Sequence, residues 1–190
     1  MWFKLTQLID LVAPYPFRAA VRSEPGGKVA VVQMQEATCS AKLSESVPRV
    51  ANQDGKYDRY LLKPGDLLIQ ARGFHNPVGL VSIDLPVIAA PGLHTLRPHL
   101  ERILPEYLAW CLNHPRTQST IAAAAQGTHA PFISKQALGA IQIPVPSLAT
   151  QHRIVEVNRL RQNERRLTVQ LSEAQDLLVN ETTWQAAIAS

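Results

Sequence analysis

The sequence predicts an α/β (α+β) domain with a curved mixed sheet over residues 1–146, followed by one long coiled-coil helix within residues 147–190. Three observations support this prediction. Short apolar runs bounded by turn residues indicate strands between residues 28 and 96. Prolines open two apolar-periodic segments between residues 105 and 125, as they do at helix starts. After Ser147 no proline or glycine occurs, and the apolar residues follow a helical spacing.

The first part of the chain is expected to hold a helix, a strand and a loop. Apolar residues in segment 5–12 repeat at i, i+3, i+4 and i+7, which predicts a helix that ends before Pro14. Residues 28–34 are short and β-branched and therefore predict a buried strand. Residues 36–56 are polar and rich in small residues, so we expect a loop there.

A turn signal then separates two apolar runs. Pro64–Gly65 lies between Tyr60–Leu62 and Leu67–Ile69, which predicts a strand, a tight turn and a second strand. Further short apolar runs are expected to extend the sheet, namely residues 78–83, 85–90 and 93–96.

Three helices are expected before the chain becomes extended again. Pro105 and Pro115 suit first helical turns, where the missing N–H is not needed, and Gly127 ends the second helix. Ser134 can cap a short third helix. Residues 141–146 contain two prolines and are therefore expected to be extended.

The last segment predicts one helix from about residue 147 to 180 with a coiled-coil seam. Its apolar residues alternate at three and four positions, and Glu164 interrupts them. We expect a protruding helix that pairs with a partner, because the stripe is narrow and flanked by charge. The alternative is an amphipathic helix folded back on its own domain. The seam residues are Val157, Leu160, Leu167, Leu171, Ala174 and Leu178.

Charge is distributed unevenly along the 190 residues, of which 46% are hydrophobic and 18% charged. The segment from Gln151 onward has five basic and five acidic residues, so the net charge of +4 arises entirely from residues 1–150. A modest positive excess suits a polyanionic partner, although many ordinary domains carry as much.

Cysteine usage and the N-terminus favour a cytoplasmic protein. Cys39 and Cys111 form no CxxC pair, so a disulfide framework or a zinc site is not expected. The first ten residues are too polar for a signal peptide, and no apolar stretch is long enough to span a bilayer.

Sequence motifs that would indicate catalysis or metal binding are absent. The chain has no P-loop, GxGxxG, GxSxG or HExxH motif, and no Asn-Pro-Pro-Tyr motif of methyltransferases. None of the histidines pairs with another at i, i+4, so we expect surface or loop roles and no metal. They are His75, His94, His99, His114, His129 and His152.

Four groups of segments follow one another in a characteristic order and spacing. They are Tyr60–Ile69 with Ala71–Gly73 and Val78–Gly79; Pro105–Leu108 with Leu112–Asn113 and Pro115–Arg116; Gly127–Thr128 with Ile133–Ser134 and Leu138; and Ile143–Leu148 with Gln151 and Ile154. Together they resemble the target-recognition domains of type I restriction–modification specificity subunits. The resemblance covers roughly residues 55–180 and implies a half-length form, because family members commonly carry two such domains and two long helices. Ala149 and Thr150 depart from the acidic residues often found there in the family.

This resemblance implies a non-catalytic subunit that recognises DNA. Each recognition domain of the family reads one half of a split site, and the long helices act as spacers and dock the modification subunits. The implied partners are double-stranded DNA, DNA adenine methyltransferase subunits and, where present, a restriction subunit. No cofactor is expected on this chain, because S-adenosylmethionine binds to the methyltransferase.

Cations, amides and an aromatic residue near predicted strand ends are the candidate DNA contacts. A reader of duplex DNA needs cations for phosphates and forked donors or amides for base edges. The candidates after the predicted strands are Arg72, Phe74, His75 and Asn76, together with Gln33 and Gln35. Those of the Gly127 loop and the helix after it are Thr128, His129 and Lys135.

Two other functions remain open from the sequence: a helical dimerisation scaffold of the same fold that binds protein, and a fragment of a fused methyltransferase–nuclease. We expect the seam to pair with a second copy about a two-fold axis, which would demand a palindromic split site. Glu164 could set the register by meeting Arg161 or Arg165 of the other chain. A different half-subunit, or a monomer docked on a methyltransferase, is the rival arrangement.

Overall fold

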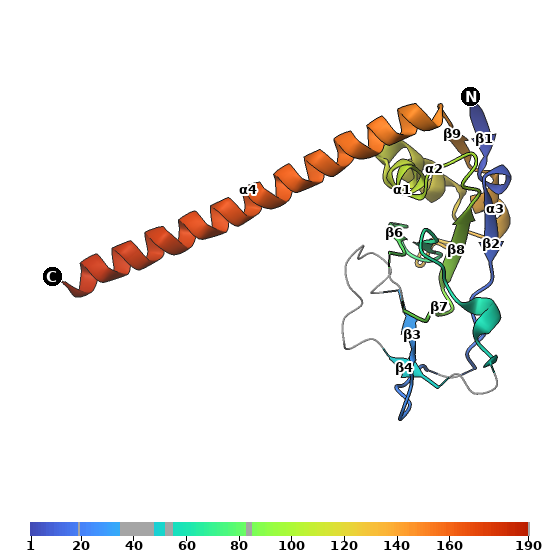
Figure 1. Ribbon diagram of the computed structural model, residues 1–190, viewed down its shortest axis with the longest axis horizontal. Helices are drawn as coiled ribbons and strands as arrows, with labels where there is room; N and C mark the ends of the chain where they lie inside the picture. The colour runs from blue at the N-terminus through green and yellow to red at the C-terminus, as the bar shows by residue number, and fades with distance from the viewer. Residues whose placement is uncertain (19, 35–47, 52–54, 83–84, 190) are drawn as a thin grey trace. The chain divides into compact units, whose positions relative to one another are not determined.

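Strands and short helices make up the first unit of the chain, Met1–Gln151, and a single helix makes up the second, His152–Ser190. The computed structural model describes residues 1–18, 20–34, 48–51, 55–82 and 85–189 (Figure 1). The predicted mixed α/β fold with one long C-terminal helix is confirmed. The described strands are divided over three sheets.

The largest sheet is antiparallel and has four strands in the order β2-β8-β5-β6. The strands are β2 (Ile9–Val12), β8 (Leu93–Pro98), β5 (Leu67–Gln70) and β6 (Val78–Leu80). The turn before β5 bends at Gly65, whose φ of +92° favours glycine. The central strands β5 and β8 are almost entirely buried, as their apolar runs predicted.

A three-stranded mixed sheet has the order β4-β3-β7, with β3 (Val29–Val32) parallel to β7 (Val87–Ala89) and antiparallel to β4 (Arg49–Val50). All four residues of β3 are buried, because alternate side chains enter apolar clusters on opposite faces. A strand buried on both faces explains the continuous apolar run in the sequence.

A two-stranded sheet joins the N-terminus to the segment before the long helix. Strand β1 (Trp2–Lys4) pairs antiparallel with β9 (Gln142–Pro144). The Tyr107 hydroxyl donates a 2.7 Å hydrogen bond to the carbonyl of Pro144, which ties the first helix to this sheet.

The predicted proline-initiated helices are confirmed as α1 (Pro105–Asn113) and α2 (Pro115–Ala124). The short helix α3 (Lys135–Ala140) begins after Ser134, whose hydroxyl accepts a 3.1 Å hydrogen bond from the backbone N–H of Ala137. The predicted N-cap of Ser134 is therefore confirmed.

The predicted N-terminal helix over residues 5–12 is wrong. Leu5, Leu8 and Ile9 are buried as the pattern required, but through a 3-10 turn over Leu5–Gln7 and strand β2. A 3-10 turn followed by a strand can bury the same three positions as a helix. The deciding interactions are the pairings of β1 with β9 and β2 with β8, whose partners lie about 90 to 140 residues away.

Two further expectations need correction near the mixed sheet. Tyr60–Leu62 was expected to be a strand, but Asp58–Tyr60 forms a 3-10 turn and only Leu61 makes a bridge, to Ile88. The predicted loop over residues 36–56 contains β4 in its described part.

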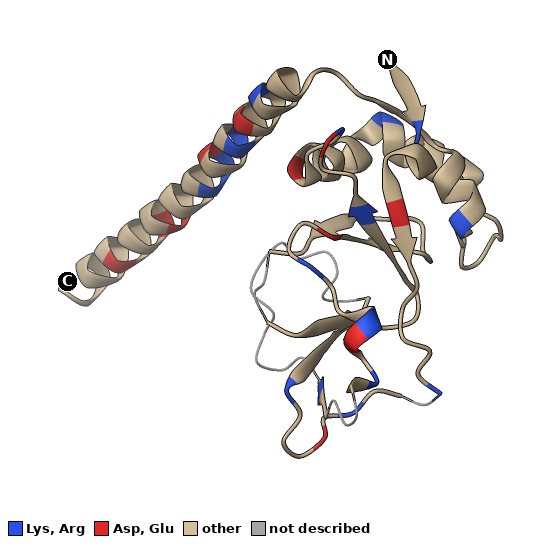
Figure 2. Ribbon diagram, turned by 45° about the vertical axis from the view of Figure 1, so that its right-hand side comes forward, with Lys and Arg blue, Asp and Glu red and all other residues tan. Residues whose placement is uncertain are grey.

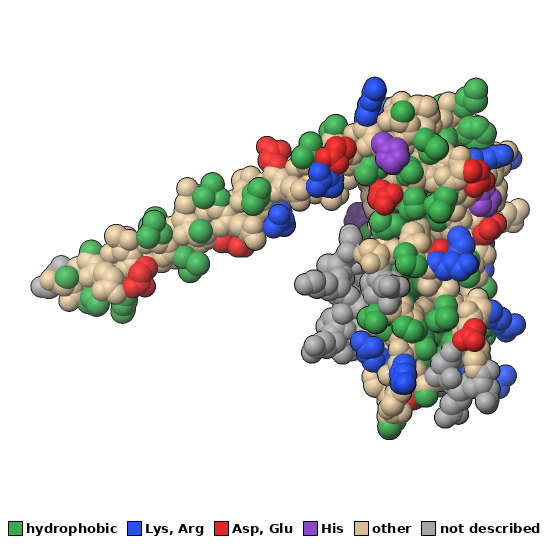
Figure 3. Space-filling model, in the orientation of Figure 1, with side chains coloured by type: hydrophobic (Ala, Val, Ile, Leu, Met, Phe, Trp, Pro, Cys, Tyr) green, Lys and Arg blue, Asp and Glu red, His purple; other side chains and the backbone are tan. Residues whose placement is uncertain are grey.

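The long helix α4 (Leu148–Ile188) has 41 residues, which corresponds to about 60 Å at 1.5 Å per residue. It extends eight residues beyond the expected end near residue 180. Figure 2 shows basic and acidic residues along the helix, and Figure 3 shows hydrophobic side chains on its surface. All six seam residues are exposed, with 54% to 68% exposed surface for the five larger ones.

Candidate nucleic-acid interface

Two loops that carry predicted DNA contacts lie side by side at the end of β5. The backbone N–H of Gly73 donates to the Pro131 carbonyl, and the N–H of Ile133 donates to the Ala71 carbonyl, each at 2.9 Å. Arg72 thereby forms an antiparallel bridge with Phe132. The loop after β5 and the loop before α3 are therefore parts of one surface, although about 55 residues separate them in sequence.

The second loop is the tip of a small hairpin. Gln126 and Phe132 exchange two backbone hydrogen bonds of 2.9 and 2.8 Å, and residues 127–131 connect them. Gly127 adopts a φ of +100°, which favours glycine. Thr128 and His129 are exposed in this tip, so the hairpin presents both of these predicted contacts to solvent.

The first loop is anchored at both ends and exposed between them. The Asn76 side chain donates a 2.7 Å hydrogen bond to the Gln70 carbonyl, and the Gln118 side chain donates one of 2.9 Å to the Asn76 carbonyl. Phe74 is 67% exposed, and Arg72 and His75 are exposed as well. These three predicted contacts are therefore available to a ligand.

Asn76 is not available to a ligand. Its exposed fraction is 2%, and its amide is used to hold the loop against β5. A buried amide with this role cannot reach a base edge, so the structure contradicts the prediction that Asn76 faces DNA. The sequence pattern could not distinguish a loop-anchoring asparagine from a DNA-reading one, because both follow a glycine-bounded strand end.

The predicted glutamines after β3 are only partly described. Gln33 is half-buried at the end of β3. The next residue, Met34, accepts a 2.6 Å hydrogen bond through its carbonyl from the side chain of Gln70. Gln33 therefore lies close to the end of β5 that carries the first loop. Gln35 lies outside the described residues.

Lys135 and His94 flank the start of α3. Lys135 is exposed in the first turn of α3, as a contact residue would need to be. His94 is buried, and its Nε2 donates a 2.8 Å hydrogen bond to the Ile133 carbonyl, which can only accept. Burial lowers the pKa of His94, and the nearby positive charge of Lys135 lowers it further, although the bond to Ile133 acts in the opposite direction.

We expect low pH to weaken the support that His94 gives to the segment before α3. Because the pKa of His94 is lowered in the folded state, the unfolded chain binds its proton more readily, and stability is lost as the pH falls below the ordinary histidine value of about 6.5. Urea midpoints measured from pH 7.5 to 5.0 should therefore fall more steeply for the native chain than for His94→Gln. His129→Gln, in the exposed hairpin tip, is the matched control and should keep the native slope.

The segments that supply the two loops contain no acidic residues. Residues 67–83 and 107–155, which supply both loops, contain no Asp or Glu. Arg72 and Lys135 therefore face no carboxylate from their own segments, and among the described residues neither forms an ion pair. Such a surface favours a phosphate backbone.

No group of three or more potential metal ligands is found among the described residues. Within the same part of the chain, no helix is long and apolar enough to cross a membrane. Cys111 is free and buried, and burial raises its pKa to about 11. Cys39 lies outside the described residues.

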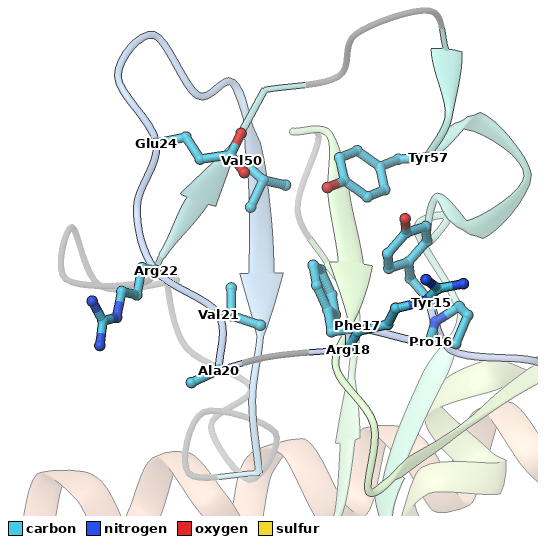
Figure 4. Close-up of a pocket in the computed structure, with 10 residues that line it drawn as sticks. All are labelled: Tyr15, Pro16, Phe17, Arg18, Ala20, Val21, Arg22, Glu24, Val50 and Tyr57. Atoms are coloured by element: carbon cyan, nitrogen blue, oxygen red, sulfur yellow. The ribbon is translucent and has the colours of Figure 1, made fainter.

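A cavity of about 500 Å³ lies on one side of the mixed sheet (Figure 4). Tyr15, Phe17 and Tyr57 contact one another edge to face or at a tilt, with ring centroids 4.7 to 6.2 Å apart. These rings pack with the buried cluster that covers β3 and β7. The cavity is therefore lined in part by the aromatic cluster that packs on the sheet, and it contains none of the predicted DNA contacts.

Two residues in line with Arg72 could not be predicted from the sequence. Gln126 and Phe132 were not singled out, because neither belongs to a motif. Gln126 precedes the glycine of the hairpin tip and Phe132 follows its proline. This flanking position was the available signal, since the residues that flank a short loop pair across it.

Comparison with known proteins identifies the family of the chain. The profile of the family described as "Type I restriction modification DNA specificity domain" matches residues 5–170. This chain belongs to that family. Comparison with curated proteins gave no match.

Solved structures of type I specificity subunits share the fold. The HsdS subunit from Thermoanaerobacter tengcongensis matches with a TM-score of 0.60 and 21% identity, over 86% of this chain and 37% of that one. The S subunit from M. genitalium matches with a TM-score of 0.60 and 16% identity, over 86% and 39%. A chain from a structure described as the basis of complex assembly and conformational transition of the type I R-M system matches with a TM-score of 0.64 and 22% identity. The match covers 88% of this chain and 39% of that one. This chain thus spans less than two fifths of each.

In this type I specificity domain, the Gly-Asp pair of the family signature supports the fold. Asp66 is 1% exposed and accepts hydrogen bonds from the Lys63 backbone N–H at 2.8 Å and from Arg97 Nε and Nη2 at 2.8 and 2.7 Å. The hydrogen bond to Asp66 raises the pKa of Arg97. Asp66 therefore joins the turn before β5 to the neighbouring strand β8.

The glutamine of the signature has a similar role. Gln151 is fully buried, and its Oε1 accepts from the Leu104 N–H at 2.9 Å while its Nε2 donates to the carbonyls of Arg102 and Pro146 at 3.0 Å. All three bonds lie within the first unit. Gln151 thus joins the first turn of α4 to the segment before α1, and both its amide oxygen and its amide nitrogen are hydrogen-bonded, as buried polar groups usually are.

Proposed function

We propose that this chain is the sequence-recognition subunit that directs a DNA methyltransferase to a split DNA site. The observation that carries this proposal is the bridged pair of loops, which exposes Arg72, Phe74, His75, Thr128 and His129 on segments that contain no Asp or Glu. The membership of the specificity-domain family supports DNA as the partner. A rigid backbone behind cationic and polar side chains is what base recognition requires.

The proposed partners follow from the family. They are double-stranded DNA, DNA adenine methyltransferase subunits and, where a restriction subunit is present, that subunit as well. The chain would act in the cytoplasm and bind no cofactor itself, because the methyltransferase subunits would bind S-adenosylmethionine. The subunit contributes recognition and the partner contributes the reaction.

The purified chain alone is expected to transfer no methyl group. Labelled S-adenosylmethionine, a pool of random duplexes and the chain should leave the DNA unlabelled, whereas addition of the methyltransferase subunits should produce labelled DNA. Labelling by the chain without a partner would contradict the non-catalytic role.

Selection from random duplex DNA tests the recognition role. The chain together with its methyltransferase subunits should enrich a defined split sequence, and binding should weaken steeply with salt because phosphate contacts release counterions. Enrichment of no sequence, with weak binding that is the same for every duplex, would favour the protein-binding scaffold instead.

Arg72→Ala should weaken specific binding by about 1–3 kcal/mol if Arg72 reads a guanine, and should relax the preference at that base alone. The measurement is a set of binding constants for the selected site and its single-base variants. Weakening that is equal for all these duplexes would instead assign Arg72 to a phosphate.

We also propose that α4 pairs with a second copy in antiparallel orientation. The seam residues are exposed in the single chain, and Glu164, Arg161 and Arg165 form no ion pair with the described residues of their own chain. They are therefore available to a partner helix. Two identical recognition domains related by a two-fold axis would read a palindromic split site. The rival partners are a different half-subunit or a methyltransferase alone.

A further inference from the structure

The bridges between the two loops place three side chains in one row. Phe132 is opposite Arg72 on one side and opposite Gln126 on the other, and both pairs are antiparallel. Residues directly opposite each other on antiparallel strands point to the same face. Arg72, Phe132 and Gln126 therefore lie in a row across three short strand segments.

Backbone hydrogen bonds join the three segments that carry this row. Gln126 and Phe132 exchange two hydrogen bonds, and the neighbouring pairs Gly73–Pro131 and Ile133–Ala71 add one each, all between 2.8 and 2.9 Å. The bond from His94 to the Ile133 carbonyl supports the same segment from the sheet side. The backbone of the row is consequently preorganised, so that binding needs to order the side chains but not the backbone.

The two polar members of the row are free to bind a ligand. Arg72 and Gln126 are both exposed, and neither side chain has a hydrogen bond or ion pair with any described residue. The Arg72 guanidinium lies 5.3 Å from the centroid of the Phe132 ring. A cation–π contact of this kind favours a position of the guanidinium over the ring while leaving its N–H donors unoccupied.

The chemistry of the row matches base edges in the major groove. A guanidinium binds guanine O6 and N7 with two hydrogen bonds, and a glutamine amide binds adenine N6 and N7 in the same way. An apolar ring contacts the methyl group of thymine. Neighbouring strands are about 4.8 Å apart, so the row spans roughly 10 Å from Arg72 to Gln126. Base pairs stacked at about 3.4 Å place that span at roughly three steps of duplex.

We propose that Gln126 is a specificity-determining residue that reads an adenine about three base pairs from the base read by Arg72, with Phe132 between them. This inference rests on the proposed function and adds to it a residue that no motif indicates. In this geometry, Arg72, Phe132 and Gln126 lie along the groove as one row. The two loops therefore do not contact the bases independently of each other.

Selection from random duplexes with the methyltransferase assembly tests this row. Gln126→Ala should lose the preference for adenine at one position by about 5- to 150-fold and keep the rest of the selected sequence. Gln126→Glu should move that preference toward cytosine, whose N4 amino group donates to a carboxylate. Arg72→Ala should change a different position, about three base pairs away. Gln142→Ala removes an exposed glutamine on β9, outside both loops, and should leave the sequence unchanged.

The possible results distinguish the role of Gln126 from the recognition role of the whole chain. A selected sequence that is the same for Gln126→Ala and Gln126→Glu as for the native chain would overturn this inference and leave the recognition role standing. Equal weakening on every duplex would also overturn it, because Gln126 would then contact phosphate. A native assembly that enriches no sequence would overturn the recognition role and this inference together. Unchanged melting temperatures for the variants show that the fold is intact.

Discussion

Replacing Arg97 with methionine is expected to destabilise the folded chain by about 3–5 kcal/mol. Asp66 is 1% exposed, and two of its three hydrogen bonds come from the Arg97 guanidinium. Methionine would fill much of the space but would leave a buried carboxylate without its counter-charge. The measurement is the urea midpoint followed by tryptophan fluorescence. A loss of this size would be a large part of the stability of an ordinary domain.

Three comparisons show whether the buried charge is the cause. Asp66→Ala should cost less than Arg97→Met, because the Arg97 side chain is 29% exposed and water can partly replace its partner. The double variant should recover part of the loss, since neither charge is then left alone. Arg159→Met breaks the exposed pair with Glu156 on α4 and should give no measurable change. If Arg97→Met also gave no measurable change in stability, the Gly-Asp signature would not have the structural role assigned to it.

Local signals in the sequence predicted local structure well. Pro105, Pro115 and Ser134 mark helix starts because a missing N–H or a capping hydroxyl acts within a few residues. The seam of α4 was likewise predictable, because one helix carries the whole repeat. The order of the strands was not, since β2 pairs with β8 and β3 with β7 over distances that no local pattern records.

The side chains of the candidate site could likewise be predicted only in part from the sequence. The glycine-containing loops at Arg72 and Gly127 were selected from the sequence separately, and backbone hydrogen bonds join them in the structure. The pattern also included Asn76, because an amide after such a loop suits both DNA reading and loop anchoring. Gln126 was not predicted because its alignment with Arg72 depends on Phe132, which is bridged to both. Contacts between segments, which create the site, are what a single sequence does not display.

The chain is expected to be a dimer with a mass of about 42 kDa, twice the 21.0 kDa of one copy, and Leu167→Asp with Leu171→Asp should make it a monomer. Both leucines lie in the seam and are exposed in the single chain. Burial of each large apolar side chain contributes roughly 1.5–3 kcal/mol, and the two-fold axis doubles every substitution. The dissociation constant should therefore rise by roughly ten-thousand-fold or more. Analytical ultracentrifugation over a range of concentrations measures both quantities.

Val169→Asp provides the matched control for this experiment. Val169 is 56% exposed on the same helix, but in the heptad of the seam it occupies the position opposite the contact face. It should therefore leave the dimer intact while adding the same charge. A native chain that stays near 21 kDa at every concentration would exclude the homodimer, and so would a seam variant that still dimerises as tightly. A dimer lost with the seam and kept with Val169→Asp would place two identical recognition domains on one DNA, and the selected sequence should then be palindromic.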